Sequence, residues 1–234
     1  MIGESSLRAR LADDWALPGA TVEAHHDGMG SATRLVSQDG RRWVAKAVAP
    51  ALRAQFAGGL SVATMLDAAG IPAGAPLPTP DGRSVVDVDA ASLALLTWVE
   101  GDPLTGAGAD EQRMIGDTLG QVHQVLDGRS AAGTQRFHWV RPQAGHLALR
   151  PWIRPAVTAA VAALDQLDPS SLTWGLLHAD PAPEHFRLDP SSGRCGLIGW
   201  SVALEGPLLY DLASAVMYVG GPDHGGHLIE AYLR

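Results

Sequence analysis

The sequence has little of several residue types, and each scarcity excludes a class of protein. A single cysteine, Cys195, rules out an internal disulfide. No uninterrupted apolar run is long enough to span a bilayer, and the first residues contain no apolar signal core. The 17 Lys and Arg residues are outnumbered by 25 Asp and Glu, and the net charge of −8 argues against a nucleic-acid-binding protein. We therefore expect a cytoplasmic protein that acts on neither membranes nor nucleic acids.

What the chain does contain is sufficient apolar residues for a proper core. It has 234 residues, of which 46% are hydrophobic, enough for one large domain or two small lobes. Its 27 glycines and 16 prolines are spread along the sequence, which predicts many turns and no low-complexity segment. The acidic balance would suit a cationic small substrate, although acidity alone selects no ligand.

Lysine is the rarest charged residue. Of the 17 basic residues only Lys46 is a lysine, and it lies within an apolar, strand-like stretch, residues 41–48. Two interpretations stay open at this point. Lys46 is either a remnant of an arginine-biased composition or a chemically active ammonium placed where a guanidinium would not fit.

The N-terminal hundred residues show mostly strand patterns. Asp39-Gly40 is a strong hairpin signal between two of them. A short helix is expected over residues 4–14, and a second helix begins at Pro50 and is closed by Gly70. The expected strands are residues 20–26, 31–38, 41–48, 83–89 and 92–100.

After the glycine-rich segment 101–110 the pattern becomes helical. Ile115 to Leu126 have helical spacing, and residues 155–167 and 206–221 are expected to form two more helices. Short strands are expected around a loop, within residues 173–189 and 193–201. The sequence therefore predicts an α+β protein with a small antiparallel-sheet N-lobe, residues 1–100, and a larger, mainly helical C-lobe, residues 101–234.

One loop concentrates side chains that can do chemistry. The segment His178-Ala179-Asp180-Pro181-Ala182-Pro183-Glu184-His185 follows an apolar strand, and its two prolines keep it out of a helix. Asp180 at the end of that strand can orient a hydroxyl and accept its proton. A capped polar turn is the simpler interpretation, and His178 alone is most often a structural histidine. A third interpretation is a metal-dependent hydrolase built on His178, Asp180 and His185.

The order of these motifs resembles the aminoglycoside phosphotransferase family, within the protein-kinase-like fold that also holds choline kinases. The segment HADPAPEH is similar to the family's catalytic loop H-G-D-x-x-x-x-N, and Ile198-Gly199-Trp200 lies over its I-D-W motif. Tyr210-Asp211-Leu212-Ala213 matches a helix start of the family. Residues 96–104 resemble its hinge, and residues 119–126 its first large-lobe helix. The resemblance covers nearly the whole chain and implies a two-lobe fold whose C-lobe is short at its C-terminus.

The resemblance also implies a nucleotide site for ATP. Gly28 and Gly30 would let the backbone approach the phosphates, and Lys46 would neutralise the α- and β-phosphates. Trp98 and Val99 would line the adenine pocket. Without the resemblance, Gly28 and Gly30 belong to an ordinary turn, and Trp98 and Val99 to an ordinary core strand.

The catalytic side of the site is carried over in the same way. Asp180 would position the acceptor hydroxyl of a small molecule. Asp211 resembles the buried aspartate that supports the catalytic loop, with His178 as a further structural residue, and His123 is interpreted as packing.

The metal-binding pattern departs from the family. The family holds its metal with the Asn of the catalytic loop and the Asp of I-D-W, and here these positions are His185 and Gly199. Imidazole suits Mn²⁺ better than Mg²⁺, and glycine offers no ligand. The nearest spare carboxylates are Glu184 and Glu205. We therefore predict His185 and Glu184 as the metal ligands if Mg²⁺ or Mn²⁺ is bound.

A second departure concerns the helix after the lysine strand. Kinase-like proteins place a glutamate there that pairs with the lysine, but here the position falls at Gly58-Gly59. Lys46 would then lack its usual partner unless Asp67 or Glu100 replaces it. Two functions follow: an ATP-dependent phosphotransferase acting on a small hydroxyl compound, and a kinase-like protein that binds a nucleotide or partner with little or no transfer. The acceptor and the oligomeric state stay open.

Overall fold

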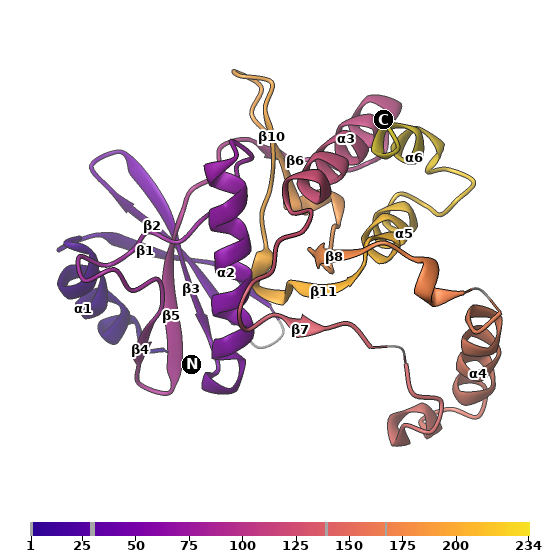
Figure 1. Cartoon of the computed structure of the whole chain (residues 1–234). Coiled ribbons are helices and arrows are strands. Elements are labelled where there is room, and N and C mark those ends of the chain that lie inside the picture. The colour runs from indigo at the N-terminus through magenta and orange to yellow at the C-terminus, as the bar shows by residue number, and fades with distance from the viewer. Residues whose placement is uncertain (1, 29–30, 139, 167) are drawn as a thin grey trace.

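A five-stranded antiparallel sheet forms the N-lobe of the computed structural model (Figure 1). The structure describes residues 2–28, 31–138, 140–166 and 168–234, with residues 26–28 and 169 described by their backbone alone. The strand order is β1-β2-β3-β5-β4. The strands are β1 (Thr21–Gly28), β2 (Ser31–Gln38), β3 (Arg41–Val48), β4 (Val86–Val88) and β5 (Ala91–Thr97).

The β2–β3 hairpin shows how the sequence sets the register of this sheet. Asp39 and Gly40 have φ angles of 51° and 75°, the left-handed pair that a tight hairpin requires. The turn pairs Thr33 with Lys46, and side chains then alternate along β3. Trp43 and Ala45 are buried on one face of the sheet, so Lys46 belongs to the opposite face. The predicted Asp-Gly hairpin is confirmed.

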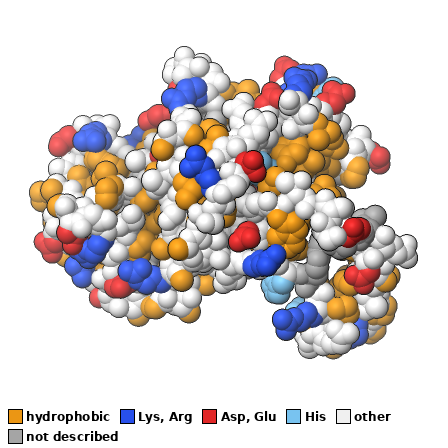
Figure 2. Space-filling model, in the orientation of Figure 1, with side chains coloured by type: hydrophobic (Ala, Val, Ile, Leu, Met, Phe, Trp, Pro, Cys, Tyr) orange, Lys and Arg blue, Asp and Glu red, His pale blue; other side chains and the backbone are white. Residues whose placement is uncertain are grey.

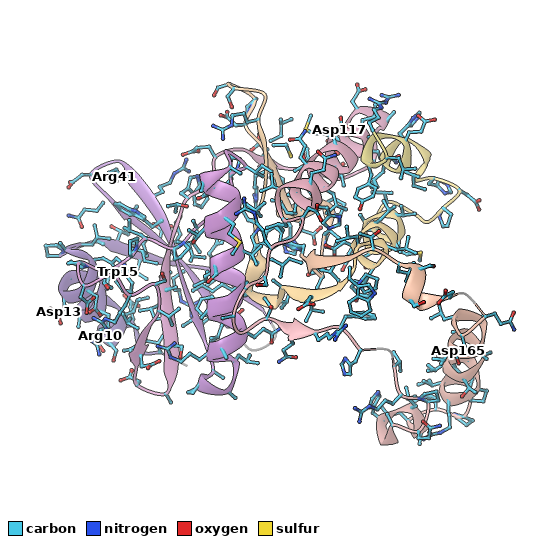
Figure 3. All side chains as sticks on the ribbon, viewed as in Figure 1. Arg10, Asp13, Trp15, Arg41, Asp117 and Asp165 are labelled. Atoms are coloured by element: carbon cyan, nitrogen blue, oxygen red, sulfur yellow. The ribbon has the colours of Figure 1, made fainter. Side chains whose placement is uncertain are left out.

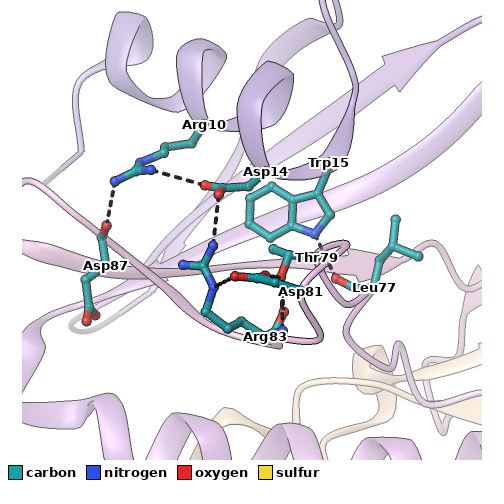
Figure 4. Close-up of polar contacts among 8 residues, drawn as sticks. All are labelled: Arg10, Asp14, Trp15, Leu77, Thr79, Asp81, Arg83 and Asp87. Carbon is teal, nitrogen blue, oxygen red and sulfur yellow. Dashed lines mark hydrogen bonds and ion pairs between the residues drawn. The ribbon is translucent and has the colours of Figure 1, made fainter.

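Helix α1 (Glu4–Trp15) covers the face that carries Trp43. A polar cluster attaches this helix to the segment that leads into β4 (Figure 4). The indole of Trp15 donates a hydrogen bond to the Leu77 carbonyl at 2.8 Å, and Arg83 contacts Asp14 at 3.3 Å. The side chain of Asp14 is largely buried, so these contacts are partly shielded from solvent and help to hold α1 in place.

Helix α2 (Arg53–Ala68) follows the short 3₁₀ turn η1 (Pro50–Leu52) and lies between the two lobes (Figure 1). Phe56 and Leu60 pack against the sheet, whereas Val62 and Leu66 belong to the core of the C-lobe. The helix is therefore buried on two sides, as its position between two hydrophobic layers requires.

Gly58 and Gly59 allow α2 to touch the C-lobe backbone directly. A Cβ on Gly59 would lie 1.9 Å from the carbonyl oxygen of Trp200, and one on Gly58 would lie 2.6 Å from the backbone nitrogen of Thr134. Two glycines cost a helix about 1 kcal/mol each relative to alanine. The close approach explains why the chain tolerates this cost, and why no glutamate occupies the position.

The C-lobe is built from helices around short strands. A single core joins α3 to residues of β8, β9 and β10, including Leu176, Phe186 and Leu197. Its helices are α3 (Ala109–Val125), α4 (Ile153–Leu164), α5 (Leu208–Tyr218) and α6 (Gly226–Tyr232). Its strands are β6 (Asp102–Pro103), β7 (Gln135–Arg136), β8 (Trp174–Leu177), β9 (Phe186–Leu188), β10 (Cys195–Leu197) and β11 (Leu204–Pro207), and its 3₁₀ turns are η2 (Gly145–Ala148), η3 (Pro169–Ser171), η4 (Pro183–His185) and η5 (Trp200–Val202).

Helix α4 stands apart from this core (Figure 1). None of its residues is buried, and the side chains near Asp165, at its C-terminal end, lie away from the rest of the C-lobe (Figure 3). On the face shown in Figure 2, hydrophobic side chains gather over the region of α3 and α5. The alanine-rich helix expected over 155–167 does form, but it spans Ile153–Leu164 and lies outside the core.

Two other element bounds differ from expectation. The helix expected over 206–221 begins at Leu208, because Gly206 and Pro207 pair with β8 as part of β11. The strand expected over 92–100 ends at Thr97, which leaves Trp98 and Val99 in the irregular connection between the lobes. Among the described residues, no helix is long and apolar enough to cross a membrane.

The contact between α2 and η5 predicts a stability effect. Gly59→Ala places a methyl group on the Trp200 carbonyl, and overpacking of this kind costs about 1–3 kcal/mol. After the gain in helix propensity we expect a net loss of about 2 kcal/mol, measured by urea unfolding. Ser61→Ala, on the exposed side of α2, is the matched control and should change stability by less than about 0.5 kcal/mol. Equal stabilities of the two variants would contradict the close contact.

Candidate active site

The loop after β8 is held from below by one buried carboxylate. Asp211 on α5 accepts hydrogen bonds from the backbone N–H groups of His178, at 2.6 Å, and Ala179, at 2.8 Å. The Nε2 of His123 lies 3.3 Å from the same carboxylate, and its Nδ1 lies 2.8 Å from the hydroxyl of Tyr232. Asp211 is completely buried, so these donors supply the contacts that a desolvated carboxylate needs. His123, interpreted above as packing, therefore also belongs to this hydrogen-bond network.

His178 connects the loop to the end of β10. The N–H of Asp180 donates to Nδ1 of His178 at 3.3 Å, so Nδ1 is the acceptor. Its Nε2 then carries the proton and donates to the Ile198 carbonyl at 2.8 Å. Complete burial, together with the nearby His185, lowers the pKa of His178 to about 4. His178 is thus a neutral structural residue at physiological pH, as the resemblance implied.

The backbone turns sharply at Ala179, which has a φ of 71°. This left-handed conformation costs a residue with a Cβ about 1–2 kcal/mol, and the hydrogen bond from its N–H to Asp211 helps to hold it. The turn brings Asp180 to the surface, where 42% of its side chain is exposed. The strand, the buried anchor and the turn together present one carboxylate to solvent.

The two oxygens of Asp180 have different surroundings. Oδ1 accepts a hydrogen bond from the hydroxyl of Tyr218, on α5, at 2.6 Å. Oδ2 lies 3.9 Å from Nδ1 of His185, but that nitrogen donates to the Asp180 carbonyl at 2.7 Å. Among the described side chains, no donor reaches Oδ2 within hydrogen-bond distance. Asp180 therefore has one carboxylate oxygen that no described donor occupies.

A cavity of about 530 Å³ lies between the sheet, α2 and the C-lobe. Predicted site residues from both lobes line it: Lys46, Trp98, Val99, Glu184 and His185. Asp180 is not part of the lining and is linked to it through the ring of His185. The described backbone of Gly28 pairs with Ser31 at the end of β1, and Gly30 lies outside the described residues.

Lys46 lies in the lining of this cavity, largely withdrawn from solvent, and has an unusual partner. Its Nζ donates to the hydroxyl of Ser201 at 2.9 Å, across the lobe boundary. Burial lowers the pKa of the Lys46 ammonium. Within the described part of the chain, no carboxylate forms an ion pair with it. A buried ammonium without a counter-charge favours an anionic ligand.

The carboxylates proposed to replace the missing helix glutamate are engaged elsewhere. Asp67 accepts hydrogen bonds from the N–H groups of Ala73, at 2.6 Å, and Ala75, at 3.2 Å, and so fixes the proline-rich crossing segment. Glu100 pairs with Arg42 at 2.7 Å. The alternative left open above, that Asp67 or Glu100 replaces the missing partner of Lys46, finds no support, because each carboxylate already has a partner away from the lysine.

The cavity also has apolar and aromatic walls. Val44, Leu96 and Ile198 contribute to them, and Trp98 is part of the lining with Arg42 stacked 4.5 Å above its ring. Arg187 adds a positive charge to the lining. Apolar walls combined with the charges of Lys46 and Arg187 suit a ligand with a flat base and an anionic tail.

The residues at the predicted metal position do not fit a protein-held Mg²⁺. Mg²⁺ needs several oxygen ligands in octahedral geometry, and Gly199 supplies none. Glu184 and His185 do line the cavity, but within residues 2–28, 31–138, 140–166 and 168–234 no three His, Cys, Asp or Glu side chains are grouped to hold a metal. His185 and Glu184 as ligands stay a prediction, and the three-residue metal site of the hydrolase interpretation finds no support.

Sequence reasoning missed Ser201, Arg187 and Tyr218. Tyr218 lies seven residues after Asp211, which is two helical turns and therefore the same face of α5, so spacing could have identified it. Ser201 follows the Ile-Gly-Trp motif directly, but no local signal connects it to Lys46, 155 residues earlier in the chain.

Comparisons with known proteins agree with this geometry. A family model described as the phosphotransferase enzyme family matches residues 21–234. The homoserine kinase of Rhizobium johnstonii is 28% identical over 157 residues, covering 63% of this chain and 48% of that protein; the homoserine kinase of Sinorhizobium fredii is 27% identical over 147 residues, covering 59% and 44%. The chain thus spans about half the length of the curated relatives it matches.

Solved structures show the same fold at low sequence identity. An amicoumacin kinase in complex with AMP-PNP and Ca²⁺ has a TM-score of 0.80 and 16% identity, covering 99% of this chain and 76% of the other. The choline kinase of Streptococcus pneumoniae has a TM-score of 0.73 and 14% identity, covering 98% and 79%. The predicted protein-kinase-like fold with a sheet N-lobe and a helical C-lobe is confirmed.

The buried His178 predicts a pH-dependent stability. Its pKa of about 4 in the folded chain lies below the ordinary value of about 6.5, so between these values only the unfolded chain binds the proton. The contribution is complete above pH 6.5 and is lost as the pH falls to 4, by about 3 kcal/mol. Urea unfolding should therefore show the stability gap between wild type and His178→Gln shrinking over this window.

His146→Gln, at an exposed position, is the control for this experiment. Its stability should follow that of the wild type at every pH. A gap between wild type and His178→Gln that stays constant from pH 7 to pH 4 would show that His178 titrates normally.

Proposed function

Because this chain belongs to the phosphotransferase enzyme family, we propose that it transfers the γ-phosphoryl group of ATP to a hydroxyl group of a small molecule. One observation carries the proposal. The single lysine is buried beside the cavity that also contacts the loop of Asp180, and its partner is a serine hydroxyl instead of a carboxylate. Its charge is therefore available for phosphates, which spread negative charge over their oxygens during transfer.

The proposal assigns a role to each part of the nucleotide site. Trp98 and Val99 bind the adenine through their backbone and the apolar walls. Lys46 neutralises the α- and β-phosphates, as the resemblance implied. Gly28, at the end of β1, approaches the phosphates, and the same role expected of Gly30 falls outside the described residues.

Asp180 performs the proton transfer in this proposal. Its free Oδ2 orients the acceptor hydroxyl and takes the proton as the oxygen bonds to the γ-phosphorus. The bond from that phosphorus to the β-phosphate oxygen breaks, and ADP leaves. The protein works in the cytoplasm, where ATP is available. The acceptor belongs to the small hydroxyl compounds that include homoserine and choline, for which relatives are named.

ADP release in the presence of ATP, a divalent metal and a panel of acceptors tests this function. The panel includes homoserine, choline and an aminoglycoside. We expect Asp180→Asn to lower the rate by about 10²- to 10⁴-fold, the usual contribution of a positioned acid or base. Asp165→Asn, an exposed carboxylate at the end of α4, is the control and should retain full activity. An active protein with an unaffected Asp180→Asn variant would refute the role of Asp180.

Gly199 favours a second function, a kinase-like protein that binds a nucleotide with little or no transfer. Metal bridging of the phosphates supplies much of the transition-state stabilisation in phosphoryl transfer, and glycine removes the side chain that would hold the ion. Nucleotide-dependent thermal stabilisation without ADP release from any acceptor would support this second function.

Restoring the carboxylate distinguishes the two functions. A Cβ at Gly199 would lie 3.4 Å from Nε2 of His178 and from Cδ2 of His185, so a side chain has room, although the φ of 100° strains it. Gly199→Ala carries the same strain without a ligand and is the matched control. We expect Gly199→Asp to exceed Gly199→Ala by at least about tenfold in Mg²⁺-dependent transfer, and to bind ATP more tightly with Mg²⁺ than without it in calorimetry. Equal behaviour of the two variants would show that position 199 does not bear on metal use.

A further inference from the structure

Helix α5 contacts the loop of Asp180 with two side chains from one face. Asp211, on its first turn, binds the backbone of the loop, and Tyr218, on its last turn, binds the side chain of Asp180. The seven-residue spacing is two helical turns, so one rigid element sets both the backbone and the carboxylate.

A carboxylate on a short side chain can rotate about its last bond, so one fixed oxygen determines where the other points. In Asp180, Tyr218 occupies Oδ1 at 2.6 Å, and Oδ2 has no donor among the described groups. His185 does not compete for Oδ2, because its Nδ1 proton goes to the Asp180 carbonyl. The orientation of the free oxygen therefore depends on the phenol.

The protonation of Tyr218 fits this arrangement. Its hydrogen bond to Asp180, with partial burial and the nearby Glu184 carboxylate, raises the pKa of Tyr218 to about 12. The phenol therefore keeps its proton at neutral pH, and it donates to the carboxylate.

We propose that Tyr218 is a positioning residue for phosphoryl transfer, which holds Oδ1 of Asp180 so that Oδ2 faces the acceptor hydroxyl. The expected effect on turnover rests on the proposed function. The orientation of Asp180 by Tyr218 rests on the hydrogen bond alone. The rival interpretation is that the phenol stands in the place of the acceptor hydroxyl and obstructs its binding.

Tyr218→Phe separates the two interpretations in steady-state kinetics. Positioning predicts that kcat falls about tenfold, as expected for the loss of one hydrogen bond to a charged group, while KM for ATP and acceptor changes less than about twofold. Tyr210→Phe, on the same helix, is the control, because the ring of Tyr210 contacts Phe137. This variant should keep the wild-type kcat and KM. An unchanged kcat, or a lower acceptor KM with equal or higher kcat, would overturn the proposal.

A second measurement does not depend on turnover. The ¹³Cζ resonance of Tyr218, assigned from its loss in Tyr218→Phe, reports ionisation of the phenol. In the wild type it should stay un-ionised up to pH 11, whereas in Asp180→Asn ionisation should begin near the ordinary value of about 10. Ionisation near 10 in the wild type would overturn the proposal. If the phenol ionises only above pH 11 but the protein shows no phosphoryl transfer, the hydrogen bond is supported and the proposed function is rejected.

Discussion

The buried carboxylate of Asp211 is the interaction on which the rest of the site depends. It accepts two backbone N–H groups of the loop and lies within reach of His123, so one side chain joins β8, α3 and α5. Hydrogen bonds to a charged group are each worth about 1.5–3 kcal/mol, and a buried carboxylate without donors would be strongly unfavourable. The left-handed turn at Ala179 and the outward position of Asp180 both follow from this anchor, because the carboxylate fixes the N–H groups of His178 and Ala179, the two residues that precede Asp180.

The contact between the lobes is the second constraint, and it explains the departures from the family pattern. Gly58 and Gly59 bring α2 onto the backbone of the C-lobe, which leaves no room there for a glutamate. Lys46 consequently finds its partner across the boundary, at Ser201. A neutral hydroxyl orients the ammonium without cancelling its charge. The positive charge of Lys46 in the cavity lining is therefore less neutralised than it would be in an ion pair.

The residues of the site bear on function in opposite directions. In the proposed function Asp180 and Lys46 provide the proton acceptor and the phosphate contact, whereas Gly199 lacks the side chain of a metal ligand that such chemistry normally uses. A cavity without that carboxylate carries less negative charge, which favours the binding of a nucleotide tail even as it weakens the hold on an ion. We therefore expect nucleotide binding and phosphoryl transfer to be separable properties of this protein.

Local patterns in the sequence determined much of the outcome. Alternation and the Asp39-Gly40 turn predicted the β2–β3 hairpin, and the apolar strand before His178 predicted that Asp180 lies just after the end of a strand. The sequence alone also showed that Lys46 is the single lysine and that no acidic residue lies near Gly58. Both observations depend only on the order of the residues along the chain.

What only the tertiary structure decided are the contacts between distant segments. Ser201 reaches Lys46 across 155 residues without any periodic signal. Tyr218 reaches Asp180 across 38 residues, and helical spacing indicates only that it shares a face with Asp211. The glycines of α2 read as a weakness in the sequence and proved to be a contact surface in the fold. The physical reason is that hydrophobic period and turn chemistry specify an element and its buried face, whereas the partner of a polar side chain depends on how those faces pack together.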